Sequence, residues 1–184
     1  MNQRQTIICA GLLLAMIAPT PGIDTAALAQ PSHLMVPQSI SFEHAAIVER
    51  LTKEAAKSGV SAAIAQRALI LIKAHFAKEE EFVLPPLGLL DQITAGELPT
   101  DSVKKAALDM IERAKASKDN LQEDEIQITS IMNELVQAAT RADETDLAVF
   151  ASNVAAHNLG EIEVLEPATL LIGDYLRSKP STGE

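Results

Sequence analysis

Two segments of the chain carry the same pattern, and this pattern constrains the fold more than any other feature. Each has a histidine, a glutamate four residues later and a proline six residues after the glutamate: His75, Glu79 and Pro85 in one, His157, Glu161 and Pro167 in the other. On an α-helix, residues four apart lie on the same face, one turn from each other. An imidazole and a carboxylate placed in this way can hold one metal ion. The pattern therefore predicts two helices, each with a metal-binding pair.

Apolar residues extend the face on which each pair lies. In the first segment, the steps of four and three residues that mark a core-facing stripe connect Ala68, Ile72, His75, Glu79 and Phe82. No segment alternates with the period of a strand. Helical patterns cover residues 41–57, 61–84, 101–142 with a break near 117–120, 143–167, and a short terminal stretch at 168–177. The expected fold class is all-α: an antiparallel four-helix bundle with a short C-terminal helix.

Short polar residues and prolines set the expected helix boundaries. Ser41, Ser61 and Asp143 are expected at helix N-termini, because their side chains can accept hydrogen bonds from the first free backbone N–H groups. Pro85 and Pro86 are expected to end the second helix, since proline lacks the backbone N–H and clashes with the preceding turn.

The first 29 residues have the pattern of a secretory signal peptide. Arg4 supplies a positive start, residues 7–18 are apolar but too short to span a bilayer, and the sequence ending at Ala29 is an Ala-x-Ala cleavage site. Cleavage there removes Cys9, the only cysteine, so the mature protein has no thiolate ligand. We therefore expect a periplasmic protein with no membrane span after cleavage; the alternative is an uncleaved N-terminal anchor. The expected organisation is a signal peptide at 1–29, an extended lead-in at 30–39, the bundle at 40–178 and a tail at 179–184.

Length and charge narrow the class of function. The 184 residues suit one domain with a sizeable core. The formal net charge of −10 argues against nucleic acid as a partner, because phosphates call for a basic face. Protein partners and the oligomeric state stay open.

The two halves of the chain match beyond the histidine–glutamate pairs. His44 lies 31 residues before His75, and Glu125 lies 32 residues before His157, each on the core-facing stripe of the preceding helix. Asp124 fits its stripe less well and is the alternative to Glu125. The half-repeat therefore predicts six metal ligands: His44, His75, Glu79, Glu125, His157 and Glu161.

Buried charge distinguishes a metal site from an ordinary helical core. Unpaired buried carboxylates are very costly, and these stripes carry almost no lysine or arginine to neutralise them. Lys118 is the one basic candidate, and it would pair with Glu125 if that residue lay off the stripe. A metal centre would supply the missing positive charge, so metal binding is the favoured interpretation.

The chain resembles the hemerythrin-like, or HHE cation-binding, family over residues 39–176. The segments that carry the resemblance are 42–47 (Phe-Glu-His-Ala-Ala-Ile), 75–87 and 157–168. The resemblance implies a four-helix bundle with a non-haem di-iron centre. It implies that three histidines are terminal nitrogen ligands: His44, His75 and His157. It also implies that two glutamates are bridging ligands: Glu79 and Glu161.

The third helix departs from the family, which usually has a histidine where this chain has Glu125. Oxygen-carrying members have more histidine, so reversible oxygen binding is in doubt, and three histidines with three glutamates are closer to the di-iron carboxylate composition. Two iron ions are the expected cofactor, with manganese and zinc open because carboxylate and imidazole accept both.

Three classes of function follow from these residues. The favoured one is a binding protein that holds iron, and O2 or NO as a diatomic ligand, for sensing, storage or detoxification. The second is an enzyme on the same site, a di-iron carboxylate oxidase or peroxidase, for which no dedicated proton donor stands out. The third is a metal-free helical interaction module.

Cleavage after Ala29 is directly measurable. The intact mass of protein from the periplasmic fraction should correspond to a chain that begins at Gln30. A full-length chain retained in the membrane fraction would show that residues 1–29 act as an anchor instead.

Overall fold

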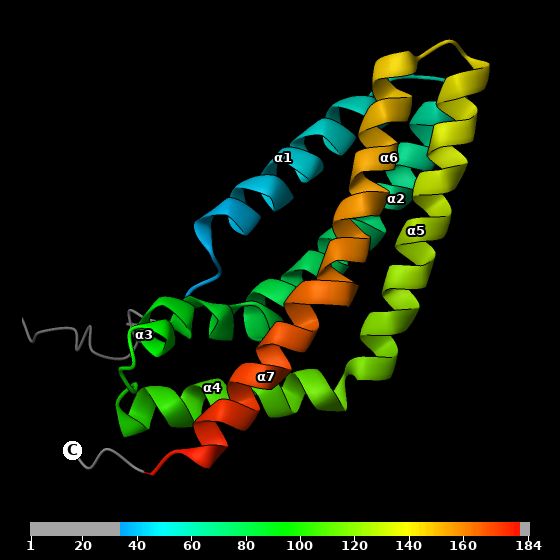
Figure 1. Cartoon of the computed structure of the whole chain (residues 1–184). Coiled ribbons are helices and arrows are strands. Elements are labelled where there is room, and N and C mark those ends of the chain that lie inside the picture. Colours follow the sequence, from blue (N-terminus) through cyan, green and yellow to red (C-terminus); the bar gives the residue numbers. More distant parts are fainter. Residues whose placement is uncertain (1–33, 181–184) are drawn as a thin grey trace, which may run out of the picture.

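The computed structural model of the chain describes residues 34–180 (Figure 1). Every regular element within this range is a helix, and no strand occurs in it, which confirms the all-α prediction. The predicted signal peptide, the start of the lead-in and residues 181–184 of the predicted tail lie outside the described range.

Two of the helices are extended by short π-helical turns, and a 3-10 turn follows the first of them. In chain order the elements are α1 (Gln38–Ala55), α2 (Val60–Lys78), the π turn η2 (Glu79–Val83), the 3-10 turn η3 (Pro85–Leu89), α3 (Leu90–Thr94), α4 (Asp101–Ala116), α5 (Lys118–Arg141), α6 (Thr145–Gly160), the π turn η4 (Glu161–Leu165) and α7 (Glu166–Ser178).

Four helices lie side by side in the upper part of Figure 1: α1 packs on α2, α2 on α5, and α5 on α6. Their apolar stripes meet in one core, whose fully buried side chains include Leu51, Ile72, Met132 and Leu135. A second core lies below it, where α4 and α7 pack against η2 and η3. The candidate ligands lie on the helices of the first core and on the π turns that extend two of them.

Both π turns begin at the glutamate of a histidine–glutamate pair. The backbone N–H of Leu84 donates to the carbonyl of Glu79 at 2.8 Å, and the N–H of Glu166 donates to the carbonyl of Glu161. Each bond joins residues five apart, so each turn holds one residue more than an α-helical turn. Such turns are rare and occur frequently at functional sites. The half-repeat inferred from sequence thus extends to a backbone feature that the side-chain pattern did not predict.

Both prolines of the repeated pattern lie where one helical segment gives way to the next. Helix η2 ends at Val83 and Pro85 opens a 3-10 turn, as expected. Pro167 does not interrupt its helix, because it lies in the first turn of α7, where a missing N–H costs least. The terminal helix therefore begins at Glu166 and continues α6 through η4. The break expected near residues 117–120 lies at Ser117, between α4 and α5.

The first helix begins before the predicted position. Helix α1 starts at Gln38 with Pro37 as its N-cap, so Ser41 is inside the helix and the lead-in is shorter than 30–39. Proline is favourable here because its fixed φ suits the start of a helix.

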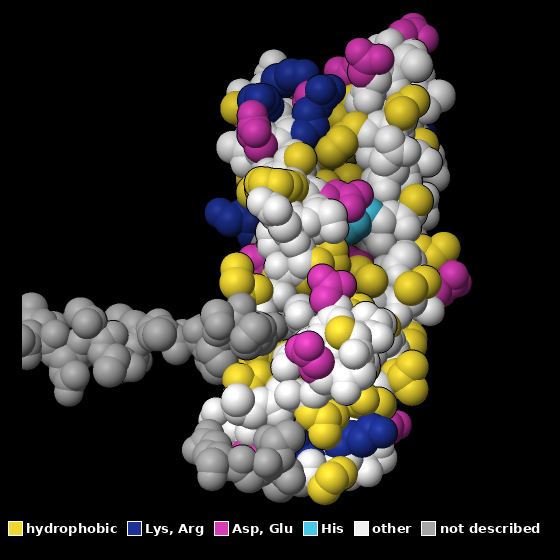
Figure 2. All heavy atoms as spheres, turned by 60° about the vertical axis from the view of Figure 1, so that its left-hand side comes forward, with side chains coloured by type: hydrophobic (Ala, Val, Ile, Leu, Met, Phe, Trp, Pro, Cys, Tyr) yellow, Lys and Arg dark blue, Asp and Glu magenta, His cyan; other side chains and the backbone are white. Residues whose placement is uncertain are grey.

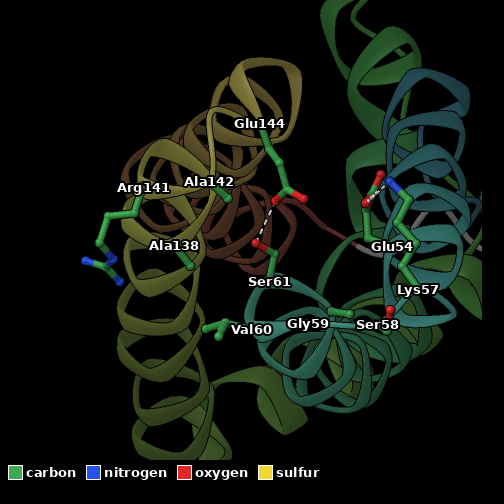
Figure 3. A pocket seen from close by; sticks show the side chains of 11 residues that line it. Glu54, Lys57, Ser58, Gly59, Val60, Ser61, Ala138, Arg141, Ala142 and Glu144 are labelled. Carbon is green, nitrogen blue, oxygen red and sulfur yellow. Dashed lines mark hydrogen bonds and ion pairs between the residues drawn. The ribbon is translucent and has the colours of Figure 1, made fainter.

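Neither Ser61 nor Asp143 caps a helix. Gly59, with a φ of 109°, is the N-cap of α2, and the Ser61 hydroxyl instead donates to Glu144 Oε2 at 2.6 Å (Figure 3). This bond ties the start of α2 to the connection before α6, across a polar pocket. Asp143 has a positive φ of 57° in that connection, and α6 begins at Thr145. A short polar side chain tolerates the left-handed region, so Asp143 is used in the turn and not as the cap.

One helix of the described part, Val60–Val83, is long and apolar enough to cross a bilayer by length and composition. A core helix has the same properties, and the face of this one that carries Ala68, Ile72 and Phe82 is buried against the other helices.

The core position of Ile72 can be tested against an exposed isoleucine two residues away. Ile72 is fully buried, whereas Ile70 is 72% exposed on the same helix. Ile72→Ala should lower the free energy of unfolding by about 2–5 kcal/mol, because it leaves a cavity. Ile70→Ala should change it by about 0.5 kcal/mol or less. Urea unfolding of the mature protein measures both; equal losses would mean that this face of α2 is not core.

Candidate metal centre

Five of the six predicted ligands lie together, on α1, α2, α6 and the two π turns. Their side chains are between 0% and 7% exposed, in an interior that consists mainly of apolar residues. They form two groups, in each of which one nitrogen or oxygen atom per residue lies within 4.8 Å of the others: His44, His157 and Glu161 in one, His75, Glu79 and Glu161 in the other. The half-repeat therefore predicted which distant residues the fold brings together.

Glu161 belongs to both groups. Its Oε1 lies 2.9 Å from His44 Nε2 and 3.2 Å from His157 Nε2, and the same side chain faces His75 and Glu79. Glu79 also reaches across: its Oε1 is 3.2 Å from His75 Nε2, and its Oε2 is 3.8 Å from His44 Nε2. Two carboxylates placed between two sets of imidazoles are suited to hold two adjacent cations.

Each imidazole directs one nitrogen to this interior and the other to an outer carboxylate. His44 Nδ1 lies 2.9 Å from Glu80, His157 Nδ1 lies 3.3 Å from Glu43, and His75 Nδ1 lies 3.6 Å from Asp124: these three carboxylates form the outer shell. A carboxylate at the outer nitrogen orients a metal-binding imidazole and raises its basicity. The arrangement thus leaves Nε2 of every ring as the atom available to a metal.

Sequence reasoning missed the outer shell, although its members are chain neighbours of predicted ligands. Glu43 precedes His44, and Glu80 follows Glu79. An acidic residue beside a ligand on a helix points away from the centre, so only contact with a different helix reveals its role. Phe76 was missed for the same reason: its ring stacks on that of His44, with centroids 3.6 Å apart and planes at 4°.

Glu125 lies on the buried side of α5, as its stripe predicted, with 2% of its surface exposed. Asp124 is 18% exposed and pairs with Lys78 Nζ at 2.6 Å. Glu125 belongs to neither group; its carboxyl faces that of Glu166 at the start of α7. Within the described residues no ion pair joins Lys118 to Glu125.

The pKa values of the site residues depend on two opposing effects: burial of the charged groups and close pairing between imidazoles and carboxylates. Burial lowers the pKa of His44, His75 and His157, but hydrogen bonds and the negative charge of Glu161 or Glu79 outweigh it, so each pKa is raised. Burial raises the pKa of Glu79. It acts in the same direction on Glu161, but hydrogen bonds from His157 and His44 outweigh it and lower that pKa. Without metal, the site therefore retains protons.

Glu125 has a pKa raised to about 8. Burial is the main cause, and the adjacent carboxyl of Glu166 adds to it. At neutral pH the carboxyl of Glu125 therefore holds a proton unless a cation replaces it.

Unsatisfied polar atoms are concentrated at the centre. Both ring nitrogens of His75, both oxygens of Glu79 and one oxygen each of Glu125 and Glu161 are buried with no hydrogen bond of acceptable geometry. Each such atom costs about 1–3 kcal/mol, and native proteins leave few of them. A metal ion would satisfy them, and the donor set of imidazole and carboxylate fits iron, manganese or zinc.

The centre lies close to the surface. Figure 2 shows a histidine side chain between acidic side chains on one face of the molecule, with apolar side chains around it. The neighbouring aromatic ring of Phe76 meets His157 edge to face, with centroids 5.8 Å apart.

Comparison of the chain with known protein families, with curated proteins and with solved structures finds no match. The family resemblance seen in the sequence therefore stays an expectation. The geometry of the two groups is the evidence on which a function can be based.

The pKa shifts predict how the metal-free protein responds to pH. The three histidines, Glu79 and Glu125 bind protons more tightly when folded, so the stability they contribute is present at low pH and is lost as pH rises through the folded pKa values. Glu161, whose pKa is lowered, contributes above its unfolded value of 4.5 and loses nothing in this range. The melting temperature of chelator-treated protein should therefore fall between pH 6 and pH 8.

Glu125→Gln is the test of this assignment, because glutamine keeps the shape of the neutral carboxyl. The variant should show a smaller fall than the wild type between the two pH values. Bound metal should also reduce the fall, since it competes with the protons. A metal-free melting temperature that rises from pH 6 to pH 8 would contradict the predicted direction.

Proposed function

We propose that the chain is an exported hemerythrin-like protein, folded as an antiparallel four-helix bundle, that binds two non-haem iron ions and a diatomic ligand such as O2 or NO. The single observation that carries this proposal is the position of Glu161, a buried carboxylate shared by two histidine–glutamate groups. One shared carboxylate between two donor sets is what a dinuclear centre requires.

The distances support a division of the ligands between two ions. His44 and His157 would bind one ion and His75 the other, each through Nε2, while Glu79 and Glu161 would bridge the two. The side-chain pairs come from different helices, which is how di-metal carboxylate centres are built in helical proteins. The outer carboxylates would hold the rings in orientation before metal arrives, which reduces the cost of binding.

Iron is proposed because the donor set combines imidazole with hard carboxylate oxygen, and this combination accommodates both ferrous and ferric ions. Iron would supply the open coordination position at which a small gas molecule binds. The chain's own residues would keep that position dry: Phe76 covers His44, and Ile72 and Met132 are fully buried in the adjoining core. Sensing, storage or detoxification in the periplasm are the roles that such a site suits.

A metal-free interaction module is the competing interpretation. It leaves both buried oxygens of Glu79 and one of Glu161 without a hydrogen bond, and it assigns no role to the outer carboxylates at all three imidazoles. Each of these features has a physical reason only when cations occupy the centre.

Glu161→Gln tests the shared carboxylate directly. Wild-type protein purified from iron-replete cells should carry about two metal ions per chain, as in di-iron bundles. The variant should retain well under one, because both ions lose a ligand and a neutralising charge. Elemental analysis gives the stoichiometry, and near-ultraviolet absorption identifies a bridged ferric pair.

Glu163→Gln is the matched control, since Glu163 is exposed on the same π turn. It should keep the wild-type metal content. Wild-type protein without metal, yet with normal helicity and a normal melting temperature, would favour the interaction module instead.

A further inference from the structure

Glu166 is directed to the centre by the π turn that precedes it. The backbone bond from its N–H to the carbonyl of Glu161 places Glu166 one turn from that residue. In an uninterrupted α-helix the residue one turn from Glu161 would be Leu165. The extra residue of the π turn thus replaces a leucine with a carboxylate beside the candidate ligands.

Two of the positions at which the halves of the chain differ are related, because the second-half residues at those positions contact each other. In the half-repeat, His44 corresponds to Glu125, and Leu84, five residues after Glu79, corresponds to Glu166. Leu84 is fully buried in the second core. In the second half of the chain both positions are glutamate, and their carboxyls face each other. A paired change of this kind indicates one shared role.

That role requires a cation. Glu125 is 2% exposed, and Oε1 of Glu125 and Oε1 of Glu166 are buried without a hydrogen-bond partner. No lysine or arginine of the described part forms an ion pair with either residue. Two facing carboxylates, one of them buried and the other partly buried, need a proton or a positive ion between them.

The two ligand groups are unequal, and the glutamate pair lies next to the poorer one. One group contains two imidazoles, whereas the other contains only that of His75. Glu125 interacts with the charges of His75 and Glu79. The pair therefore adds oxygen donors where nitrogen donors are lacking.

We propose that Glu166 is a further metal-binding residue, which together with Glu125 completes the position at His75 and makes it carboxylate-rich. This inference rests on the proposed dinuclear centre. Four glutamates, Glu79, Glu125, Glu161 and Glu166, then balance the charge of two divalent cations. The two positions differ in preference: the one at His75 favours a hard ion such as Mn²⁺, and the one at His44 and His157 favours an imidazole-seeking ion such as Zn²⁺.

Glu166 is also partly accessible to solvent. It lines a cleft of about 270 Å³ whose walls include the apolar side chains of Val83, Leu121 and Leu170. Lys115 and Lys118 also line this cleft, but within the described residues neither forms an ion pair with Glu166. Solvent in this cleft can thus reach the side chain of Glu166. Of the three imidazoles, that of His157, which belongs to the imidazole-rich group, is the most exposed, at 7%.

The test is a Mn²⁺ titration of the metal-free mature protein, followed by electron paramagnetic resonance of the free ion. The wild type should bind two Mn²⁺ ions in two steps. Glu166→Gln should weaken one step on the order of tenfold or more, a typical loss for a residue that supports a metal ligand, and should leave the other step intact. The retained step shows that the variant is folded. Glu163→Gln should titrate as the wild type.

Zinc assigns the affected position. With one equivalent of Zn²⁺ bound first, wild-type protein should still take up one Mn²⁺, and Glu166→Gln should not do so at the same concentration. Two unchanged Mn²⁺ steps in Glu166→Gln would overturn the role of Glu166 while leaving the dinuclear centre in place. A wild type that binds neither Mn²⁺, Zn²⁺ nor iron would instead refute the proposed function itself.

Discussion

The compensation of buried carboxylates is the constraint on which the rest of the structure depends. Glu79 and Glu161 are almost completely enclosed, and a charge so placed costs several kcal/mol unless it is paired. The described residues around them offer only imidazoles: His44, His75 and His157. Imidazoles can share protons with carboxylates, but they leave several lone pairs unused. Protons can satisfy these groups at low pH, and in the proposed dinuclear centre cations would do so at neutral pH, which would link stability to metal occupancy.

Two local distortions place these groups. Each π turn starts at a core glutamate and inserts one residue, which rotates the rest of the helix relative to the part before it. After Glu79 the inserted register directs Leu84 into the second core; after Glu161 it directs Glu166 towards Glu125. The same kind of π turn thus places a core leucine in one half of the chain and a carboxylate next to Glu125 in the other.

The outer shell explains why the imidazoles can be held so close together. Glu43, Glu80 and Asp124 each approach a ring nitrogen from outside, and Lys78 in turn pairs with Asp124. These contacts are partly exposed, so each alone contributes little to stability. Their effect is orientation: with Nδ1 directed to an outer carboxylate, each ring presents Nε2 to the interior. A site positioned in this way loses little entropy when an ion binds.

The all-α fold class and the grouping of five ligands could be predicted from the sequence, because both depend on the helical period. The residues His44, His75, Glu79, His157 and Glu161 lie on core-facing stripes, and stripes of this kind must meet in any packed helical protein. The burial of Glu125 followed from the same rule. The helical period does not determine which side chain of one helix contacts which side chain of its neighbour.

Tertiary structure alone decided the remaining features. The pairing of Glu125 with Glu166 depends on a π turn, and nothing in the side-chain pattern distinguishes that turn from an α-helical one. Ser61 does not cap α2, because its hydroxyl donates a hydrogen bond to Glu144 and not to the adjacent backbone. Glu144 lies 83 residues away in sequence. The choice of a capping residue or of a helix register changes the free energy of folding by about 1 kcal/mol. Contacts between distant segments can therefore reverse that choice. The burial of an apolar stripe is worth far more and is not reversed.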